Sequence, residues 1–319
     1  PREREELERQ VMGHWLVIDE RAGRDRLRAL FEENELGYRL AACELLLQRA
    51  RAIEGLTDLT QDWLRYLQGR LALAQNDYGG SAQVFDALQK ETDPGSELHA
   101  LVGWSRGQVA AERGEWAQAI ERYESSVRYF QGQADRAREG QVMLALGDVH
   151  LQQARALGGP IRPQLSRRKG RGRFVEAIPA FLVALPFVVY AWAIRRWRFL
   201  PPLHHGMNYR NWTLARLLLT AARWYRDAES AFVETGQEAF LVNARQRLAQ
   251  TYHRLGWWHA ARRLFDQVLR SGPVVSNAYR QAQVRKEFAD TELAADNTDE
   301  AIEQLEASLH IFERSQDVQ

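Results

Sequence analysis

The sequence predicts an all-α protein in which pairs of helices repeat to form a solenoid, with a long apolar insert between the two helices of one repeat. Three observations predict this fold. Ala, Leu, Arg, Glu and Gln dominate the 319 residues and only nine are Pro, which favours helix because long unbranched side chains lose little freedom there. Small residues recur at a fixed spacing. One interval in that spacing is much too long, and it contains the apolar insert.

Two series of small residues define the repeat, with successive separations of 40, 102 and 40 residues in the first and 102, 40 and 40 in the second. The first series is Gly107, Gly147, Ala249 and Ala289. The second series is Ala119, Ala221, Ala261 and Ala301. Four residues after each member of the second series comes a larger side chain, namely Tyr123, Tyr225, Phe265 and Leu305. Small residues let two helices approach closely, and the large residue one turn later fills the space beside them. Turn-forming residues, at Gly114 and Gly256, separate the two helices of a pair.

This pattern resembles the tetratricopeptide repeat family, in which helix pairs stack into a solenoid. The resemblance covers residues 60–156 and 212–316, and the clearest copies are Gly107–Ser126 and Ala249–Val268. The period of 40 residues is longer than the usual value of about 34. Longer helices explain the difference, and HEAT-like helix pairs, which have a similar period, are the alternative.

The chain is expected to have four segments. Residues 1–57 form an N-terminal helical cap or divergent repeat, 58–156 and 212–319 form the repeats, and 157–211 form the insert. In three copies the two small residues of a repeat are 12 residues apart, whereas Gly147 and Ala221 are 74 apart, which leaves 62 additional residues. The helices around 141–154 and 213–232 should still pack together, because the cost of closing a loop rises slowly with its length.

The insert combines a basic stretch, 166–173, with an apolar run that includes 18 uncharged residues, Ala177–Ile194. Eighteen residues are the lower limit for a membrane span. A single span would place the two helices of one repeat on opposite sides of the membrane, where they could not pack. A re-entrant or interfacial element keeps both ends on the same face and is preferred. In the third interpretation the apolar run is buried against the solenoid or a partner subunit.

The preferred interpretation predicts contact with a membrane surface through residues 165–200, at the cytoplasmic face. Arginines would meet anionic headgroups and aromatic side chains would lie at the interface. The predicted membrane-contacting residues are Arg168, Lys169, Arg171, Arg173, Phe181, Leu182, Leu185, Phe187, Val188, Tyr190, Trp192, Arg195, Arg196, Trp197 and Arg198. Nucleic acid is not an expected partner, because the net charge is only +1 and the single arginine-glycine stretch has no interleaved aromatic residues.

The sequence contains no phosphate-binding loop, nucleophile elbow or zinc-binding helix. We therefore expect no catalytic residues, no metal site and no cofactor. Cys43, the only cysteine, lies in an apolar helical stretch and is expected to be a buried structural thiol.

The family resemblance implies a concave surface lined by the first helix of each repeat. The residues expected there are Trp104, Gln108, Asp148, Asn243, Gln246, Gln250, His253, Lys286 and Asp290. A polar groove of mixed charge suits a peptide or a partner helix. The lysine and asparagine set with which some relatives hold a terminal carboxylate is not reproduced.

The predicted function is that of a non-catalytic protein–protein interaction scaffold that holds a partner at a membrane surface. The alternative is a sensor or regulatory module of a larger signalling or defence protein, with the insert buried against protein. The chain begins without Met and ends as though another repeat should follow, and these features motivate that alternative.

Overall fold

The computed structural model describes residues 13–158 and 209–316, and these residues form helices joined by short turns, without any strand. Before the insert the helices are α2 (Glu20–Leu36), α3 (Leu40–Arg51), α4 (Asp58–Ala74), α5 (Tyr78–Glu91), α6 (Glu97–Glu112), α7 (Trp116–Gly132) and α8 (Arg136–Leu157). After it they are α10 (Tyr209–Thr235), α11 (Glu238–Leu255), α12 (Trp258–Leu269), the short α13 (Gly272–Val275), α14 (Ala278–Ala294) and α15 (Thr298–Gln316).

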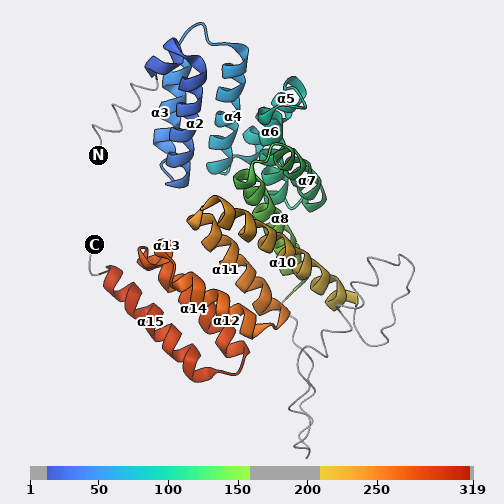
Figure 1. The fold of residues 1–319 in the computed structure, drawn as a ribbon, viewed down its shortest axis with the longest axis vertical. Helices are drawn as coiled ribbons and strands as arrows, with labels where there is room; N and C mark the ends of the chain where they lie inside the picture. Colours follow the sequence, from blue (N-terminus) through green and yellow to red (C-terminus); the bar gives the residue numbers. More distant parts are fainter. Residues whose placement is uncertain (1–12, 159–208, 317–319) are drawn as a thin grey trace, which may run out of the picture.

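The helices pack in successive pairs. These pairs are α2 with α3, α4 with α5, α6 with α7, α8 with α10, α11 with α12, and α14 with α15. Figure 1 shows the pairs following a curved path, so that the first and last described helix pairs lie at opposite ends. The predicted all-α helical-repeat solenoid is confirmed.

Polar side chains fix where several helices begin. The carboxylate of Asp77 accepts a hydrogen bond from the backbone N–H of Gly80 at 2.9 Å, and Asn277 accepts one from the N–H of Arg280 at 2.9 Å. Such N-caps satisfy backbone donors that have no partner inside the helix. The second helix of one pair and the first helix of the last pair therefore start at defined residues.

The predicted turns within the pairs are present. Gly114 and Gly256 have φ values of 74° and 76°, in the left-handed region, which glycine adopts at little cost. Ala134, between α7 and α8, also has a positive φ of 54°. The left-handed turn is therefore required by the connection and is formed even where the sequence does not supply glycine.

Close packing within the pairs depends on the small residues of the repeat. A Cβ added at Gly107 would lie 2.5 Å from Cε1 of Tyr123, and one added at Gly147 would lie 2.5 Å from Cε1 of Tyr225. Both tyrosine rings are buried. The predicted combination of a small residue with a large one therefore brings α6 against α7 and α8 against α10.

The pair α8 and α10 is formed across the insert. Gly147 and Tyr225 lie on opposite sides of it in sequence and in direct contact in the fold, which confirms that the repeat closes despite the long interval. All of the predicted membrane-contacting residues lie outside the described residues, since they fall between Arg168 and Arg198. None of the described helices combines the length and apolarity that a membrane crossing requires.

Candidate functional site: a polar groove across α8, α11 and α14

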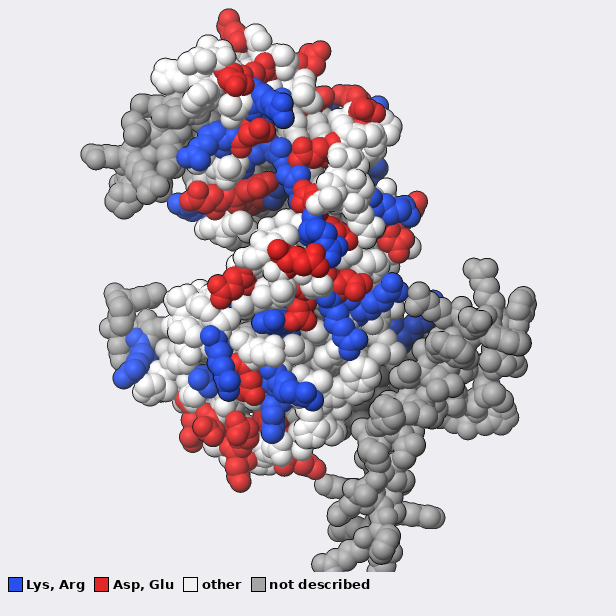
Figure 2. All heavy atoms as spheres, viewed as in Figure 1, with Lys and Arg blue, Asp and Glu red and all other residues white. Residues whose placement is uncertain are grey.

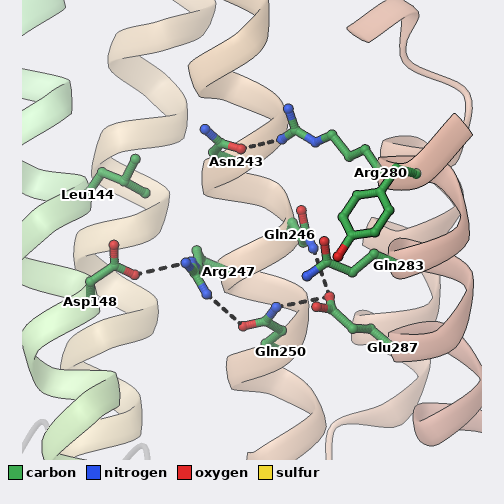
Figure 3. A pocket seen from close by; sticks show the side chains of 10 residues that line it. Leu144, Asp148, Asn243, Gln246, Arg247, Gln250, Arg280, Gln283 and Glu287 are labelled. Carbon is green, nitrogen blue, oxygen red and sulfur yellow. Dashed lines mark hydrogen bonds and ion pairs between the residues drawn. The ribbon is translucent and has the colours of Figure 1, made fainter. Parts of the chain in front are cut away.

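The first helices of three consecutive pairs, α8, α11 and α14, enclose an open cavity of about 420 Å³. Figure 3 shows these helices side by side, with polar side chains pointing into the space between them. The lining residues are Leu144 and Asp148 from α8, Asn243, Gln246, Arg247 and Gln250 from α11, and Tyr279, Arg280, Gln283 and Glu287 from α14. We refer to this cavity as the C-terminal groove.

Asp148 connects the C-terminal groove to the helix pair that carries the insert. Its Oδ1 accepts a hydrogen bond of 2.8 Å from the hydroxyl of Tyr225 on α10 and lies 3.3 Å from Nε of Arg247 on α11. Burial raises the pKa of the Asp148 carboxyl, while Arg247, the Tyr225 hydroxyl and Arg155 oppose that rise. This carboxylate therefore has partners on two neighbouring helices.

Glu287 receives its hydrogen bonds from amide side chains. Nε2 of Gln246 and Nε2 of Gln250 each donate to Oε2 of Glu287, at 2.9 Å in both cases. These contacts join α11 to α14 (Figure 3). Both donors are uncharged, so they orient the Glu287 carboxylate without neutralising it.

Arg280 makes the second connection between α11 and α14. Its guanidinium donates a hydrogen bond to the side-chain oxygen of Asn243. Burial lowers the pKa of Arg280. Desolvation disfavours the charged form of a basic group, and a nearby negative charge would offset this effect.

The charges of the C-terminal groove are balanced overall. Asp148 and Glu287 face Arg247 and Arg280 in one cavity. Figure 2 shows the same mixture on a larger scale, with acidic and basic side chains interspersed over this face of the molecule. The groove therefore presents separated charges of both signs rather than a field of one sign.

Four of the nine predicted groove residues line this cavity, namely Asp148, Asn243, Gln246 and Gln250. Their role in binding a partner stays a prediction. The other five do not line it. Trp104 packs edge-on against Phe130, with 6.5 Å between the ring centroids. The remaining four are Gln108 on α6, the half-buried His253 on α11, and the exposed Lys286 and Asp290 on α14.

Six lining residues were not predicted, namely Leu144, Arg247, Tyr279, Arg280, Gln283 and Glu287. A signal for Gln283 was present, because it precedes Ala289 by six residues just as Asn243 precedes Ala249. Tyr279 and Arg280 lie in the first turn of α14. The small-residue pattern does not extend that far, so their position became clear only from the packing of α14 against α11.

Cys43, the only cysteine of the sequence, lies on α3. Cys43 is buried, as predicted, and burial raises the pKa of its thiol to about 11. Reactivity requires the thiolate, so this cysteine is in its unreactive form at neutral pH. The described residues contain no group of three potential ligands that could hold a metal ion.

Comparison with known proteins identifies the architecture. No family model matches the sequence, and no curated protein matches it. Solved structures do match. BtubC (BKLC) from P. vanneervenii is similar with a TM-score of 0.57 and 11% identity, over 88% of this chain and 92% of that one. A putative kinesin light chain with TPR-like repeats from Podosopora anserina has a TM-score of 0.53 and 11% identity, over 79% and 95%. The fold is a tetratricopeptide-type helical repeat.

A further match to this tetratricopeptide-type fold covers nearly the whole chain. A Rap protein complexed with Competence and Sporulation Factor has a TM-score of 0.54 and 10% identity, over 98% of this chain and 67% of that one. At these identities the similarity concerns the fold. It decides between the tetratricopeptide and HEAT-like alternatives in favour of the tetratricopeptide type.

Proposed function

We propose that this chain is a non-catalytic protein-interaction scaffold that binds an extended peptide segment of a partner in the C-terminal groove. The observation that carries the proposal is the row of amide side chains on α11, formed by Asn243, Gln246 and Gln250, which faces an open cavity of about 420 Å³. An amide side chain carries both donors and an acceptor. Such a row can pair with the N–H and C=O groups that an extended peptide presents along its length.

The comparisons support this proposal at the level of the fold. The Rap protein of the same architecture was solved in a complex with Competence and Sporulation Factor. A solenoid of this type can therefore hold a bound molecule. The residues that would do so here are those of the C-terminal groove.

A selection experiment tests the proposal directly. A random peptide library is displayed and selected against the full chain, and enriched peptides are titrated by fluorescence anisotropy. We expect the combined substitution Asn243→Ala, Gln246→Ala and Gln250→Ala to weaken binding by tenfold or more, since each lost hydrogen bond contributes about 1 kcal/mol. The matched control is Gln267→Ala, an exposed amide on α12 outside the groove. No enrichment, or equal affinity for the triple variant, would show that the groove is not a peptide site.

We also propose that the insert, 157–211, holds the scaffold at the cytoplasmic face of a membrane. The proposal is supported by the uncharged run Ala177–Ile194 with arginines on both sides. The test is co-sedimentation of the full chain with vesicles of phosphatidylcholine alone or with phosphatidylserine, compared with a variant lacking residues 160–205. We expect binding that increases with the anionic lipid and is lost on deletion. Equal recovery of both forms in the supernatant would favour the alternative, a sensor module with the insert covered by protein.

A further inference from the structure

Two charged side chains in the C-terminal groove have no partner of opposite charge among the described residues. Arg280 is hydrogen-bonded to the neutral amide of Asn243. Burial is the cause that lowers its pKa, with no offsetting carboxylate. Glu287 accepts hydrogen bonds from Gln246 and Gln250, which are also neutral. Each charge is therefore oriented by amides and left uncompensated.

The other two charged residues of the groove, Asp148 and Arg247, form an ion pair with each other. Asp148 and Arg247 lie 3.3 Å apart and neutralise each other. An uncompensated charge in a partly desolvated cavity is unfavourable, and a ligand group of opposite charge would remove that cost. A charged ligand would therefore be held by Arg280 and Glu287, whereas Asp148 and Arg247 are already paired with each other.

The separation of these positions matches an extended peptide. Arg280 and Glu287 are seven residues apart on α14, which is two helical turns or about 10.5 Å. Their amide partners Asn243 and Gln250 are also seven residues apart, on α11. Both contacts therefore cross from α14 to α11 at two levels of the groove (Figure 3). Three residues of a polyproline II chain rise about 9 Å and complete one turn, so side chains three positions apart point in the same direction.

We infer that the ligand of the C-terminal groove is a peptide in the polyproline II conformation with a carboxylate at Arg280 and, three residues away, a basic side chain at Glu287. This inference rests on the proposed peptide-binding function and specifies its ligand. Amides between the two charges pair with the peptide backbone, and the charges fix its register and direction.

The library selection is repeated on Arg280→Glu and Glu287→Arg to test the inference. Peptides enriched on the unaltered chain should carry an acidic and a basic residue three positions apart. Arg280→Glu should replace the acidic preference by a basic one, and Glu287→Arg should do the reverse. The matched controls are Arg263→Glu on α12 and Glu303→Arg on α15. Both are exposed residues outside the groove, and both variants should enrich the same peptides as the unaltered chain.

A second variant protects the test against a folding defect in the charge reversals. Arg280→Gln keeps a donor for Asn243 and loses only the charge. It should weaken an enriched peptide by tenfold or more, because hydrogen bonds to charged groups are the stronger ones. Circular dichroism checks that each variant is folded. An unchanged affinity for folded Arg280→Gln would overturn the inference.

The outcomes separate the inference from the proposed function. Enriched peptides without the charge pair, or with the same preferences on all variants, would overturn the inference and leave peptide binding intact. No enrichment on the unaltered chain would overturn both. Amidating the C-terminus of an enriched peptide distinguishes the sources of the carboxylate: unchanged affinity assigns it to an acidic side chain, and lost affinity assigns it to the chain terminus.

Discussion

The hydroxyl of Tyr225 on α10 donates a hydrogen bond of 2.8 Å to Oδ1 of Asp148 on α8, although the two residues are 77 positions apart in the chain. The same tyrosine ring covers Gly147, and the same carboxylate pairs with Arg247 of α11. One contact therefore closes the repeat across the insert and positions a wall of the C-terminal groove.

Removing this hydrogen bond should destabilise the fold. Tyr225→Phe keeps the buried ring and deletes the hydroxyl that donates to Asp148. We expect a loss of about 1.5–3 kcal/mol in the free energy of unfolding, which is typical of hydrogen bonds to charged groups. The measurement is urea denaturation followed by circular dichroism. The matched control is Tyr123→Phe, because Tyr123 fills the equivalent position beside Gly107 and its hydroxyl has no hydrogen-bond partner in the described chain. Equal effects of the two substitutions on stability would show that the Tyr225–Asp148 hydrogen bond does not stabilise the fold.

The close approach of α8 and α10 should make Gly147 intolerant of a side chain. A Cβ at this position would lie 2.5 Å from the Tyr225 ring, and we expect Gly147→Ala to cost about 1–3 kcal/mol through overpacking. Gly132 ends α7 with nothing within 4 Å of an added Cβ. Gly132→Ala should therefore be neutral or stabilise by roughly 0.5 kcal/mol, because alanine favours helix. Thermal unfolding of both variants tests this, and a tolerated Gly147→Ala would mean that the two helices are farther apart.

The raised pKa of Asp148 predicts a pH dependence of stability. The folded pKa lies above the unfolded value of about 4, so the folded state binds this proton more tightly. The contribution of Asp148 to stability is therefore greatest at low pH, and it falls as the pH rises from the unfolded pKa through the folded one. Asp148→Asn keeps an acceptor for Tyr225 and cannot titrate.

The pH prediction is tested by comparing the unaltered chain with Asp148→Asn. Urea denaturation at a series of pH values from about 4 to about 7 should show the unaltered chain losing stability relative to the variant as pH rises. A difference that stays constant, or changes in the opposite direction, would show that the carboxyl is not destabilised by burial.

The turn between α7 and α8 offers a stabilising substitution. Ala134 is exposed and has a φ of 54°, a conformation that costs residues with a Cβ about 1–2 kcal/mol. Glycine avoids that cost but is more flexible in the unfolded chain, so we expect Ala134→Gly to stabilise by about 1 kcal/mol. Ala156→Gly, at an exposed position in the last turn of α8, should instead destabilise by up to roughly 0.5 kcal/mol. Differential scanning calorimetry of the pair should therefore show shifts of opposite sign.

Some of the residues that line the C-terminal groove could be predicted from the sequence and others could not. Asn243, Gln246 and Gln250 were predictable because they share α11 with Ala249, and residues on one helix keep fixed directions relative to each other. Arg280 and Tyr279 belong to another helix, α14, whose position depends on the packing of its Phe288 against Phe265 of α12. Lys286 was expected in the groove, yet it is exposed on α14 and does not line the cavity.

Within 60–156 and 212–316, the sequence by itself determined the helix pairs, their order, the small and large residues at which they touch and the repeat that spans the insert. These features are local or periodic, and the spacing of small and large residues specifies them directly. The tertiary structure alone decided which charges remain unpaired. The sequence does not show which charged residues are paired among Asp148, Arg247, Arg280 and Glu287. Only the distances between helices show that Asp148 and Arg247 neutralise each other while Arg280 and Glu287 face neutral amides.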